Sequence, residues 1–221
     1  MTSDLPTNDD PVIDVPSPID LRRKPDAEAW AQAAMSRRPW REDFFVRIAS
    51  EIAASPRRRV LELGSGPGFL ARAVIEALGD VDYTLLDFSN AMHQLARNRL
   101  GELGARARFV TSSFRDSGWI HGLGRFDAVV TMQAVHELRH KAYARELHAQ
   151  VKSVLAEGAS YLVCDHYVGA DGMTDDQLYM TVEEQRLALE AAGFPFVREL
   201  LRKRGLVLHR AAFPPGRKNA E

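Results

Sequence analysis

The sequence predicts an α/β fold in which a mostly parallel sheet carries helices on both faces. Three features of the 221 residues predict it. Short apolar segments typical of buried strands alternate with helical segments from residue 60 onward. A glycine-dense turn at residues 64–68 joins the first strand to a helix, and two strands near the C-terminal end form a hairpin. The length suits one domain with a sizeable core.

The N-terminal part divides into two regions of different composition. Residues 1–25 hold five of the eleven prolines among several aspartates, which is typical of a disordered leader. Residues 26–54 have the periodicity of two helices separated at Pro39, and we expect them to pack beside the glycine turn.

The glycine turn follows a short apolar strand that carries Glu62. Gly64, Gly66 and Gly68 form the pattern GxGxG, which gives a backbone free of side chains that a ligand can approach closely. Dinucleotide-binding folds place a third glycine one position later, where this chain has Phe69. The spacing therefore argues against a nicotinamide cofactor.

The second and third strands are predicted at residues 81–86 and 105–111. Asp87 directly follows the second strand, where a carboxylate can accept hydrogen bonds from both hydroxyls of a ribose. Ser89 or Asn90 then caps the next helix.

The fourth strand, at residues 125–134, is continuously apolar, as expected at the buried centre of a parallel sheet. Ligands of open α/β sheets bind at the carboxyl ends of strands, so we expect the chemistry there. The residues at this end are Met132, Gln133, Ala134 and His136.

His136 begins the string His136-Glu137-Leu138-Arg139-His140, which matches the HExxH pattern of zinc hydrolases. In those enzymes the string lies in mid-helix, whereas here it directly follows a buried strand, so the two histidines are not expected to face one metal. No metal ligand is assigned. His136 is instead a candidate general base or substrate anchor, with a structural histidine as the alternative.

The C-terminal third continues the alternation. A helix at residues 141–155 precedes a fifth strand at 160–164, and Asp165 and His166 follow that strand as candidate catalytic or substrate contacts. Residues 169–179 form a polar loop placed to act as a substrate lid. The remaining elements are a helix from Thr181 to Ala192 that starts with a capping box, strands at 194–201 and 206–212, and a flexible tail at 214–221.

Composition limits the function classes. The formal net charge of −1 provides no global field to recruit nucleic acid, and no apolar run is long enough to span a membrane. The lone Cys164 cannot form an internal disulfide, which favours a cytoplasmic location.

Several motifs together resemble those of class I S-adenosylmethionine-dependent methyltransferases. Residues 62–68 resemble the first motif, residues 87–92 the second and residues 125–134 the fourth, while the terminal hairpin resembles the reversed last strand. The resemblance implies a Rossmann-like domain over residues 55–213, built as a three-layer sandwich. Its seven-stranded sheet would have the order 3-2-1-4-5-7-6, with the last strand antiparallel.

The resemblance also implies site residues. N-terminal helices often cover the pocket in this family, so the helices within 26–54 are expected to do so here, and Trp30, Trp40 and Phe44 could line it or pack in the core. Glu62 and Gly64 would hold the methionine end of S-adenosylmethionine, Asp87 the ribose, and Phe88 and Ser113 the adenine. The full expected cofactor-binding set is Glu62, Gly64, Ser65, Gly66, Gly68, Asp87, Phe88, Met92, Ser113, Phe114, Met132 and Gln133.

The predicted activity is transfer of a methyl group to an oxygen, nitrogen or carbon nucleophile of a small molecule. The chain lacks the Asn/Asp-Pro-Pro-Tyr signature after its fourth strand, which argues against nucleobase amino groups and glutamine as acceptors. Three alternatives stay open: a non-catalytic S-adenosylmethionine-binding protein, an RNA methyltransferase and, more remotely, a zinc hydrolase. A homodimer is also left open.

Overall fold

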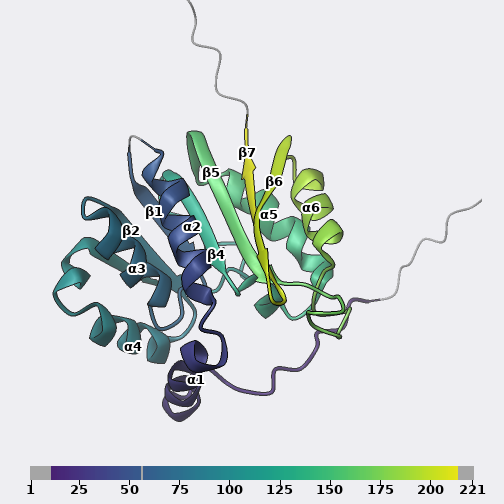
Figure 1. Ribbon diagram of the computed structural model, residues 1–221, viewed down its shortest axis with the longest axis horizontal. Helices are drawn as coiled ribbons and strands as arrows, with labels where there is room; N and C mark the ends of the chain where they lie inside the picture. Colours follow the sequence, from purple (N-terminus) through teal and green to yellow (C-terminus); the bar gives the residue numbers. More distant parts are fainter. Residues whose placement is uncertain (1–10, 56, 214–221) are drawn as a thin grey trace, which may run out of the picture.

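Seven strands form one twisted sheet in the computed structural model, which describes residues 11–55 and 57–213 (Figure 1). The strand order is β3-β2-β1-β4-β5-β7-β6, as predicted. Neighbouring strands are parallel except at β7, which is antiparallel to both β5 and β6. The strands are β1 (Arg59–Leu63), β2 (Asp82–Asp87), β3 (Ala107–Thr111), β4 (Phe126–Met132), β5 (Leu155–His166), β6 (Phe196–Lys203) and β7 (Leu206–Ala212).

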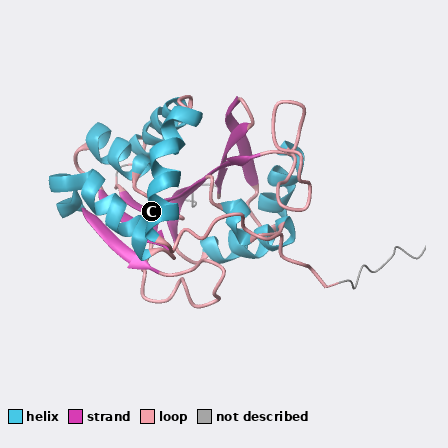
Figure 2. Cartoon of the chain, turned by 90° about the horizontal axis from the view of Figure 1, so that it is seen from below, coloured by secondary structure: helices cyan, strands magenta, loops and turns pink. Residues whose placement is uncertain are grey.

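Helices cover both faces of the sheet, which completes the three-layer arrangement (Figures 1 and 2). The helices are α1 (Lys24–Arg37), α2 (Arg41–Ala53), α3 (Phe69–Leu78), α4 (Asn90–Leu100), α5 (Ala144–Lys152) and α6 (Val182–Ala191), with 3₁₀ turns η1 (Gly101–Arg106), η2 (Val135–Leu138) and η3 (Lys141–Tyr143). Side chains alternate along each strand, so Leu61 packs in the core beneath α5 and α6, whereas Val60 packs beneath α2, α3 and α4.

Predicted caps start two of these helices. The Ser89 hydroxyl accepts a hydrogen bond from the Met92 N–H at the start of α4. Thr181 and Glu184 form the predicted capping box of α6, in which each side chain bonds the other residue's backbone N–H. These contacts fix the points at which the chain leaves the carboxyl edge of the sheet.

The N-terminal segment differs from the expected leader. Residues 11–23 form an extended strap that runs along the carboxyl edge of the parallel strands to α1 (Figure 1). The Val15 N–H donates to the Arg139 carbonyl at 2.7 Å, and the Ser89 hydroxyl donates to the Leu21 carbonyl at 2.5 Å. The expectation of disorder is therefore wrong for residues 11–25, while residues 1–10 and the expected tail at 214–221 lie outside the described residues.

The fifth strand is longer than predicted. It begins at Leu155, which pairs with Phe126, and the register shifts before Ala128 pairs with Ser160. The helix expected to run to residue 155 ends at Lys152. Gly158, a residue type common in turns, lies at this irregularity within the strand.

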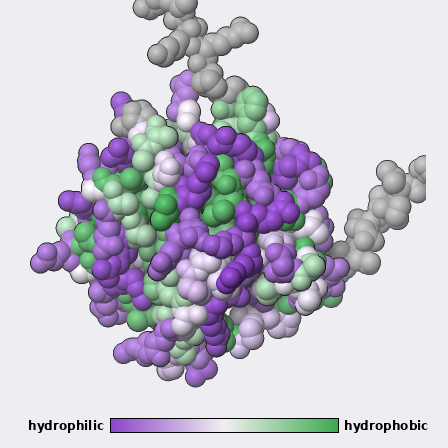
Figure 3. Space-filling model, viewed as in Figure 1, coloured by the Kyte–Doolittle hydropathy of each residue, from purple (hydrophilic) through white to green (hydrophobic). Residues whose placement is uncertain are grey.

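The surface in Figure 3 mixes hydrophilic and hydrophobic residues. Within the described residues, none of the helices combines the length and the hydropathy needed to cross a membrane.

Candidate active site

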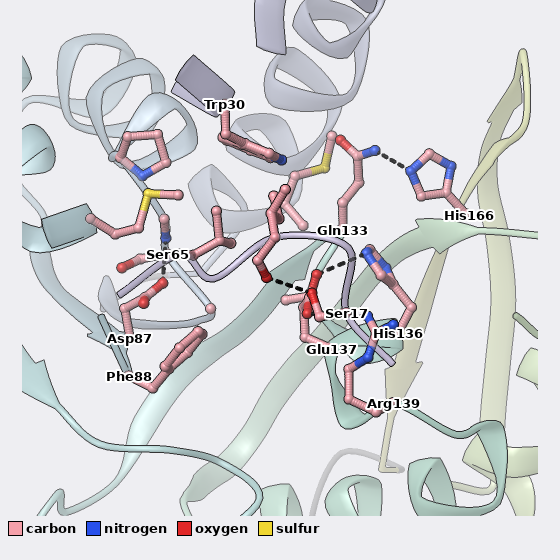
Figure 4. Close-up of a pocket in the computed structure, with 18 of the residues that line it drawn as sticks. Ser17, Trp30, Ser65, Asp87, Phe88, Gln133, His136, Glu137, Arg139 and His166 are labelled. Carbon is pink, nitrogen blue, oxygen red and sulfur yellow. Dashed lines mark hydrogen bonds and ion pairs between the residues drawn. The ribbon is translucent and has the colours of Figure 1, made fainter. Parts of the chain in front are cut away.

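A cavity of about 570 Å³ lies at the carboxyl ends of β1, β2, β4 and β5 (Figure 4). Its floor is formed by the glycine turn and by the residues that follow β2 and β4. The strap, Trp30 of α1 and Arg41 of α2 complete its walls. This is the edge at which α/β sheets bind ligands, and the volume suits a cofactor-sized molecule.

The three glycines of the turn have left-handed backbone angles but different surroundings. A Cβ on Gly66 would meet no atom within 4 Å, so this glycine faces open space in the cavity. A Cβ on Gly64 would lie 2.5 Å from that of Ala134, and one on Gly68 would lie 3.0 Å from that of Ala96. Gly64 and Gly68 are therefore required by packing, whereas Gly66 leaves room for a ligand.

Two polar side chains beside the glycine turn have unused hydrogen-bonding capacity. The buried Ser65 hydroxyl has no partner among the described residues. The buried Glu62 carboxyl accepts a hydrogen bond from the Tyr83 hydroxyl at 3.0 Å, and no described cation pairs with it within 4 Å. Burial raises the pKa of Glu62 to about 8.

Asp87 braces the glycine turn from the end of β2. One carboxyl oxygen accepts the Gly66 N–H at 2.7 Å and the other accepts the Ser89 N–H at 2.8 Å. Burial raises the pKa of Asp87 to about 6. Phe88, 39% exposed, and the buried Met92 line the cavity beside it.

The predicted adenine contacts after β3 are divided between two cavities. Phe114 is buried and lines the main cavity. Ser113 lies in an adjoining cavity between the strap and Phe88. Ser113 therefore faces the strap side of this region rather than the main cavity.

His136 lies at the start of the 3₁₀ turn η2, where three acidic contacts converge. Its Nδ1 lies 2.7 Å from Asp165 Oδ1, its backbone N–H donates to Asp165 Oδ2 at 3.0 Å, and its Nε2 lies 3.4 Å from Glu137 Oε1. Burial alone would lower the pKa of His136, but the two carboxylates outweigh it and raise the pKa to about 10. The two carboxylates therefore favour the imidazolium form of His136.

His166 and Gln133 form the adjacent part of the cavity (Figure 4). Gln133 has a φ of +58°, which is rare for a residue with a side chain, and its Nε2 lies 2.6 Å from His166 Nε2. Burial, followed by the charge of His136, lowers the pKa of His166 to about 3, so its imidazole is neutral. A neutral ring nitrogen can accept the amide hydrogen of Gln133, which leaves Nδ1 as the protonated nitrogen.

The strap is fastened over the cavity by Arg139. The Arg139 guanidinium donates to the carbonyls of Val15 and Pro16, both at 2.8 Å, and lies 3.5 Å from the Glu137 carboxylate. Arg139 itself has a φ of +69°. It thereby links the end of η2 to a segment more than a hundred residues away in the sequence.

Residues 60–158 match the family described as "Methyltransferase domain". The match covers a central segment of the chain, and the fold is that of class I methyltransferases. Its sequence is 28% identical over 159 residues to the highly reducing polyketide synthase acrA of Aspergillus aculeatus, covering 69% of this chain. It is 33% identical over 88 residues, 38% of this chain, to the reducing polyketide synthase grgA of a Penicillium species. The chain spans 6% and 4% of the length of these two relatives.

Solved structures share the fold of this chain. An O-methyltransferase family protein from Burkholderia thailandensis superposes with a TM-score of 0.69 and 17% identity, over 86% of this chain and 60% of its own. Human N-acetylserotonin methyltransferase, solved with S-adenosylmethionine, gives 0.68 and 16% identity, over 87% and 57%. The CurJ carbon methyltransferase gives 0.59 and 17% identity, over 72% and 49%.

The structure brings most of the predicted site residues together. The main cavity is lined by Glu62, Gly64, Ser65, Gly66, Asp87, Phe88, Met92, Phe114, Met132, Gln133, His136 and His166. Asp165 lies behind two of them, His136 and His166, and does not line the cavity itself. Gly68 starts α3 and packs on α4, and Ser113 lies in the adjoining cavity.

The HExxH string does not have the geometry of a zinc site. His136 bonds Asp165, whereas the His140 imidazole accepts the Ala142 N–H at the start of η3. Among the described residues, no three histidine, cysteine, aspartate or glutamate side chains gather as metal ligands would. The observed contacts instead assign the two histidines to different local structures.

Sequence reasoning missed several residues that line the cavity. The strap and the pair Arg38 and Arg41 had no motif to mark them, and Arg139 and Tyr179 were noticed only as parts of a string and a loop. Among the aromatic candidates, Trp30 lines the cavity, while Phe44 is fully buried in the core and Trp40 packs against that core.

Proposed function

We propose that the protein is an S-adenosylmethionine-dependent methyltransferase that acts on an oxygen, nitrogen or carbon nucleophile of a small molecule. One observation carries the proposal: a single cavity joins the glycine turn and Asp87 to His136, which Asp165 orients from behind. A cofactor half and an acid–base half thus lie next to each other, as a group transfer requires.

The cofactor half fits S-adenosylmethionine. The open space at Gly66 admits the body of the cofactor, and Phe88, Met92 and Phe114 offer an apolar slot for its adenine. Glu62 is a buried carboxyl without a described cationic partner, which suits the α-ammonium group, and the unpartnered Ser65 hydroxyl can bond the same polar end. Asp87 would bond the ribose hydroxyls with the lone pairs that its two backbone contacts leave free.

S-adenosylmethionine supplies a methyl carbon activated by a positively charged sulfur. The protein positions the acceptor in line with that carbon and excludes water, and the strap fastened by Arg139 contributes to the enclosure. With the cofactor bound, the acceptor's electron pair would form the new bond to the methyl carbon while the bond from that carbon to sulfur breaks, and S-adenosylhomocysteine would be the leaving group. The acceptor's proton passes to Nε2 of His136, the nitrogen that does not face Asp165.

His136 must be neutral before it can take that proton. The carboxylates of Asp165 and Glu137 raise its pKa to about 10, which favours the charged form. Positive charge brought into the cavity beside it favours the neutral imidazole, because like charges oppose protonation. We therefore infer that cofactor binding prepares His136 for its role as general base.

The acceptor is a small molecule in this proposal. The cavity volume suits one cofactor and a modest acceptor, and structural neighbours include oxygen and carbon methyltransferases. A general base favours nucleophiles that lose a proton, which are hydroxyl groups and acidic C–H groups. We also infer a cytoplasmic location, since the only cysteine is buried and unpaired.

The proposal is tested first by calorimetric titration of the metal-free protein with S-adenosylhomocysteine, with NAD as the control. Saturable binding of S-adenosylhomocysteine alone is expected, followed by methyl transfer to members of an acceptor panel. Absence of binding would contradict the assigned cofactor. Binding with no transfer to any phenol, acid, amine or β-keto compound would favour a non-catalytic binding protein.

A further inference from the structure

Two arginines stand at the junction of α1 and α2 and line the cavity. Arg41, 4% exposed, lies with its guanidinium 5.3 Å from the centre of the Trp30 ring, and its Nε donates to Oε1 of Gln133. Arg38 lies three residues earlier in the sequence, at the C-terminal end of α1, and lines the same cavity. The junction therefore places two guanidinium groups at one wall.

The charges of this pair are not neutralised by the protein. No carboxylate among the described residues lies within 4 Å of either guanidinium, although sixteen other ion pairs form elsewhere in the described chain. Burial, together with the charge of Arg38, lowers the pKa of Arg41 to about 10, and burial also lowers the pKa of Arg38. A buried cation without a partner is costly, so an anionic ligand would relieve the cost.

The two arginines lie in the acid–base half of the cavity, where the methyl acceptor is expected to bind. Gln133 connects Arg41 to His166, since its Oε1 accepts from Arg41 while its Nε2 contacts the ring of His166. Both arginines line the cavity together with His166 and Tyr179, whose ring lies 5.3 Å from that of His136. Glu62, by contrast, bonds the Tyr83 hydroxyl beside the glycine turn.

We propose that Arg38 and Arg41 bind an anionic group, carboxylate or phosphate, carried by the methyl acceptor. This inference rests on the proposed function and narrows its substrate to acidic small molecules. A guanidinium offers a planar fork of N–H donors that matches the two oxygens of such a group. Anchored there, the rest of the acceptor extends past Gln133 and His166 toward His136. Trp30 provides an apolar surface beside the anchor.

The test uses protein saturated with S-adenosylhomocysteine and follows the Nε–H signal of Arg41 by nuclear magnetic resonance. Benzoate, phenyl phosphate and uncharged benzamide are titrated at constant ionic strength. A saturable shift with benzoate, phenyl phosphate or both, and none with benzamide, is expected, and the stronger of the two identifies the preferred anion. No saturable shift with either anion, or an equal shift with benzamide, would overturn the proposal.

Two variants make the assignment specific. Arg41→Gln should raise the dissociation constant of the preferred anion by about tenfold or more, the effect of losing a charge-assisted hydrogen bond. Arg37→Gln removes the same charge from an exposed position on α1 and should leave that constant unchanged. The melting temperature of Arg41→Gln should stay equal to that of the unmodified protein or rise, because a buried unpaired charge is removed. A large fall would indicate a structural role and overturn the proposal.

The same variants separate an acceptor site from a cofactor site. If the pair held the carboxylate of the cofactor, Arg41→Gln would weaken S-adenosylhomocysteine but not 5′-methylthioadenosine, which lacks that carboxylate. This result would overturn the acceptor assignment while the proposed function stood. Failure of the unmodified protein to bind S-adenosylhomocysteine would instead contradict the proposed function itself.

Discussion

The carboxylate of Asp165 holds His136 by two contacts, one 2.7 Å from the ring Nδ1 and one of 3.0 Å to the backbone N–H. The first fixes which ring nitrogen faces the carboxylate, and the second fixes where η2 begins relative to the end of β5. Asp165 can therefore act on the reaction through His136 without lining the cavity.

This relationship predicts an unusual pH dependence. The neutral form of His136 is scarce below its pKa of about 10, so kcat/KM for S-adenosylmethionine, which reports the enzyme before the cofactor binds, should rise with pH through the neutral and alkaline range. Asp165→Asn removes the carboxylate charge that raises this pKa, so the rising limb should move to lower pH while the maximal rate falls. A profile that Asp165→Asn does not move would contradict the assignment.

Loss of the His136 imidazole gives a second prediction. His136→Ala should lower kcat by about a hundredfold, the usual contribution of a general base, while the dissociation constant of S-adenosylhomocysteine stays within about twofold. His140→Ala is the matched control, because His140 lies in the same string and serves only the start of η3. Equal losses in the two variants would point to a structural effect.

The raised pKa of Glu62 predicts that cofactor binding releases protons. Its pKa of about 8 leaves it mostly protonated at neutral pH, and an ammonium group placed beside it favours the ionised form. Calorimetric enthalpies for S-adenosylhomocysteine should therefore differ between Tris and phosphate buffers, corresponding to release of up to about one proton per site. The difference should disappear in Glu62→Gln and with 5′-methylthioadenosine, which has no ammonium group; its persistence in both would exclude Glu62.

Two glycines allow the open space at the glycine turn to be tested. Gly66 and Gly122 both have a positive φ, and a Cβ at either would meet no atom within 4 Å. Gly66→Ala and Gly122→Ala should therefore cost similar stability, about 1 kcal/mol, from backbone strain. Only Gly66→Ala should also weaken S-adenosylhomocysteine, as measured by calorimetry. Equal affinities in the two variants would show that the ligand does not approach Gly66.

The strap predicts a change in the rate of cofactor exchange. Arg139→Gln removes the guanidinium contacts to Val15 and Pro16, so S-adenosylhomocysteine should dissociate about tenfold faster in a stopped-flow displacement experiment. Arg115→Gln breaks the exposed ion pair with Asp14 on the same strap and should change the rate by less than about twofold. An unchanged rate in Arg139→Gln would mean that the strap does not control exit.

Local patterns in the sequence predict the fold because they agree with its long-range structure. The capped helix starting at Thr181 and the hairpin after it need only short-range signals, and both are confirmed. The start of β5 is not predictable in this way, because Gly158 is typical of a turn and only pairing with β4 shows that the strand has already begun. The strap likewise has the composition of a disordered leader, and its hydrogen bond with Arg139 joins residues too far apart in the sequence to be predicted from local patterns.

The residues of the candidate site also differ in how far local sequence patterns predict them. Asp87 and the glycine turn act through backbone geometry that recurs at fixed spacing, so sequence alone could place them. Arg41 is indistinguishable in sequence from any charged residue at a helix start, and only the packing of α2 buries it against Gln133. The roles assigned to the site residues stay predictions.

The segment that matches the methyltransferase family does not supply the whole cavity. Residues 60–158 supply the surfaces around Gly66, Asp87 and His136, whereas Trp30, Arg41 and His166 lie outside this segment. Under the proposed assignment of the acceptor site, substitutions at these three flanking residues would change the acceptor without altering the glycine turn. Relatives that share only the central segment would then be a guide to the methyl donor, and the acceptor would have to be sought from the chemistry of the flanks.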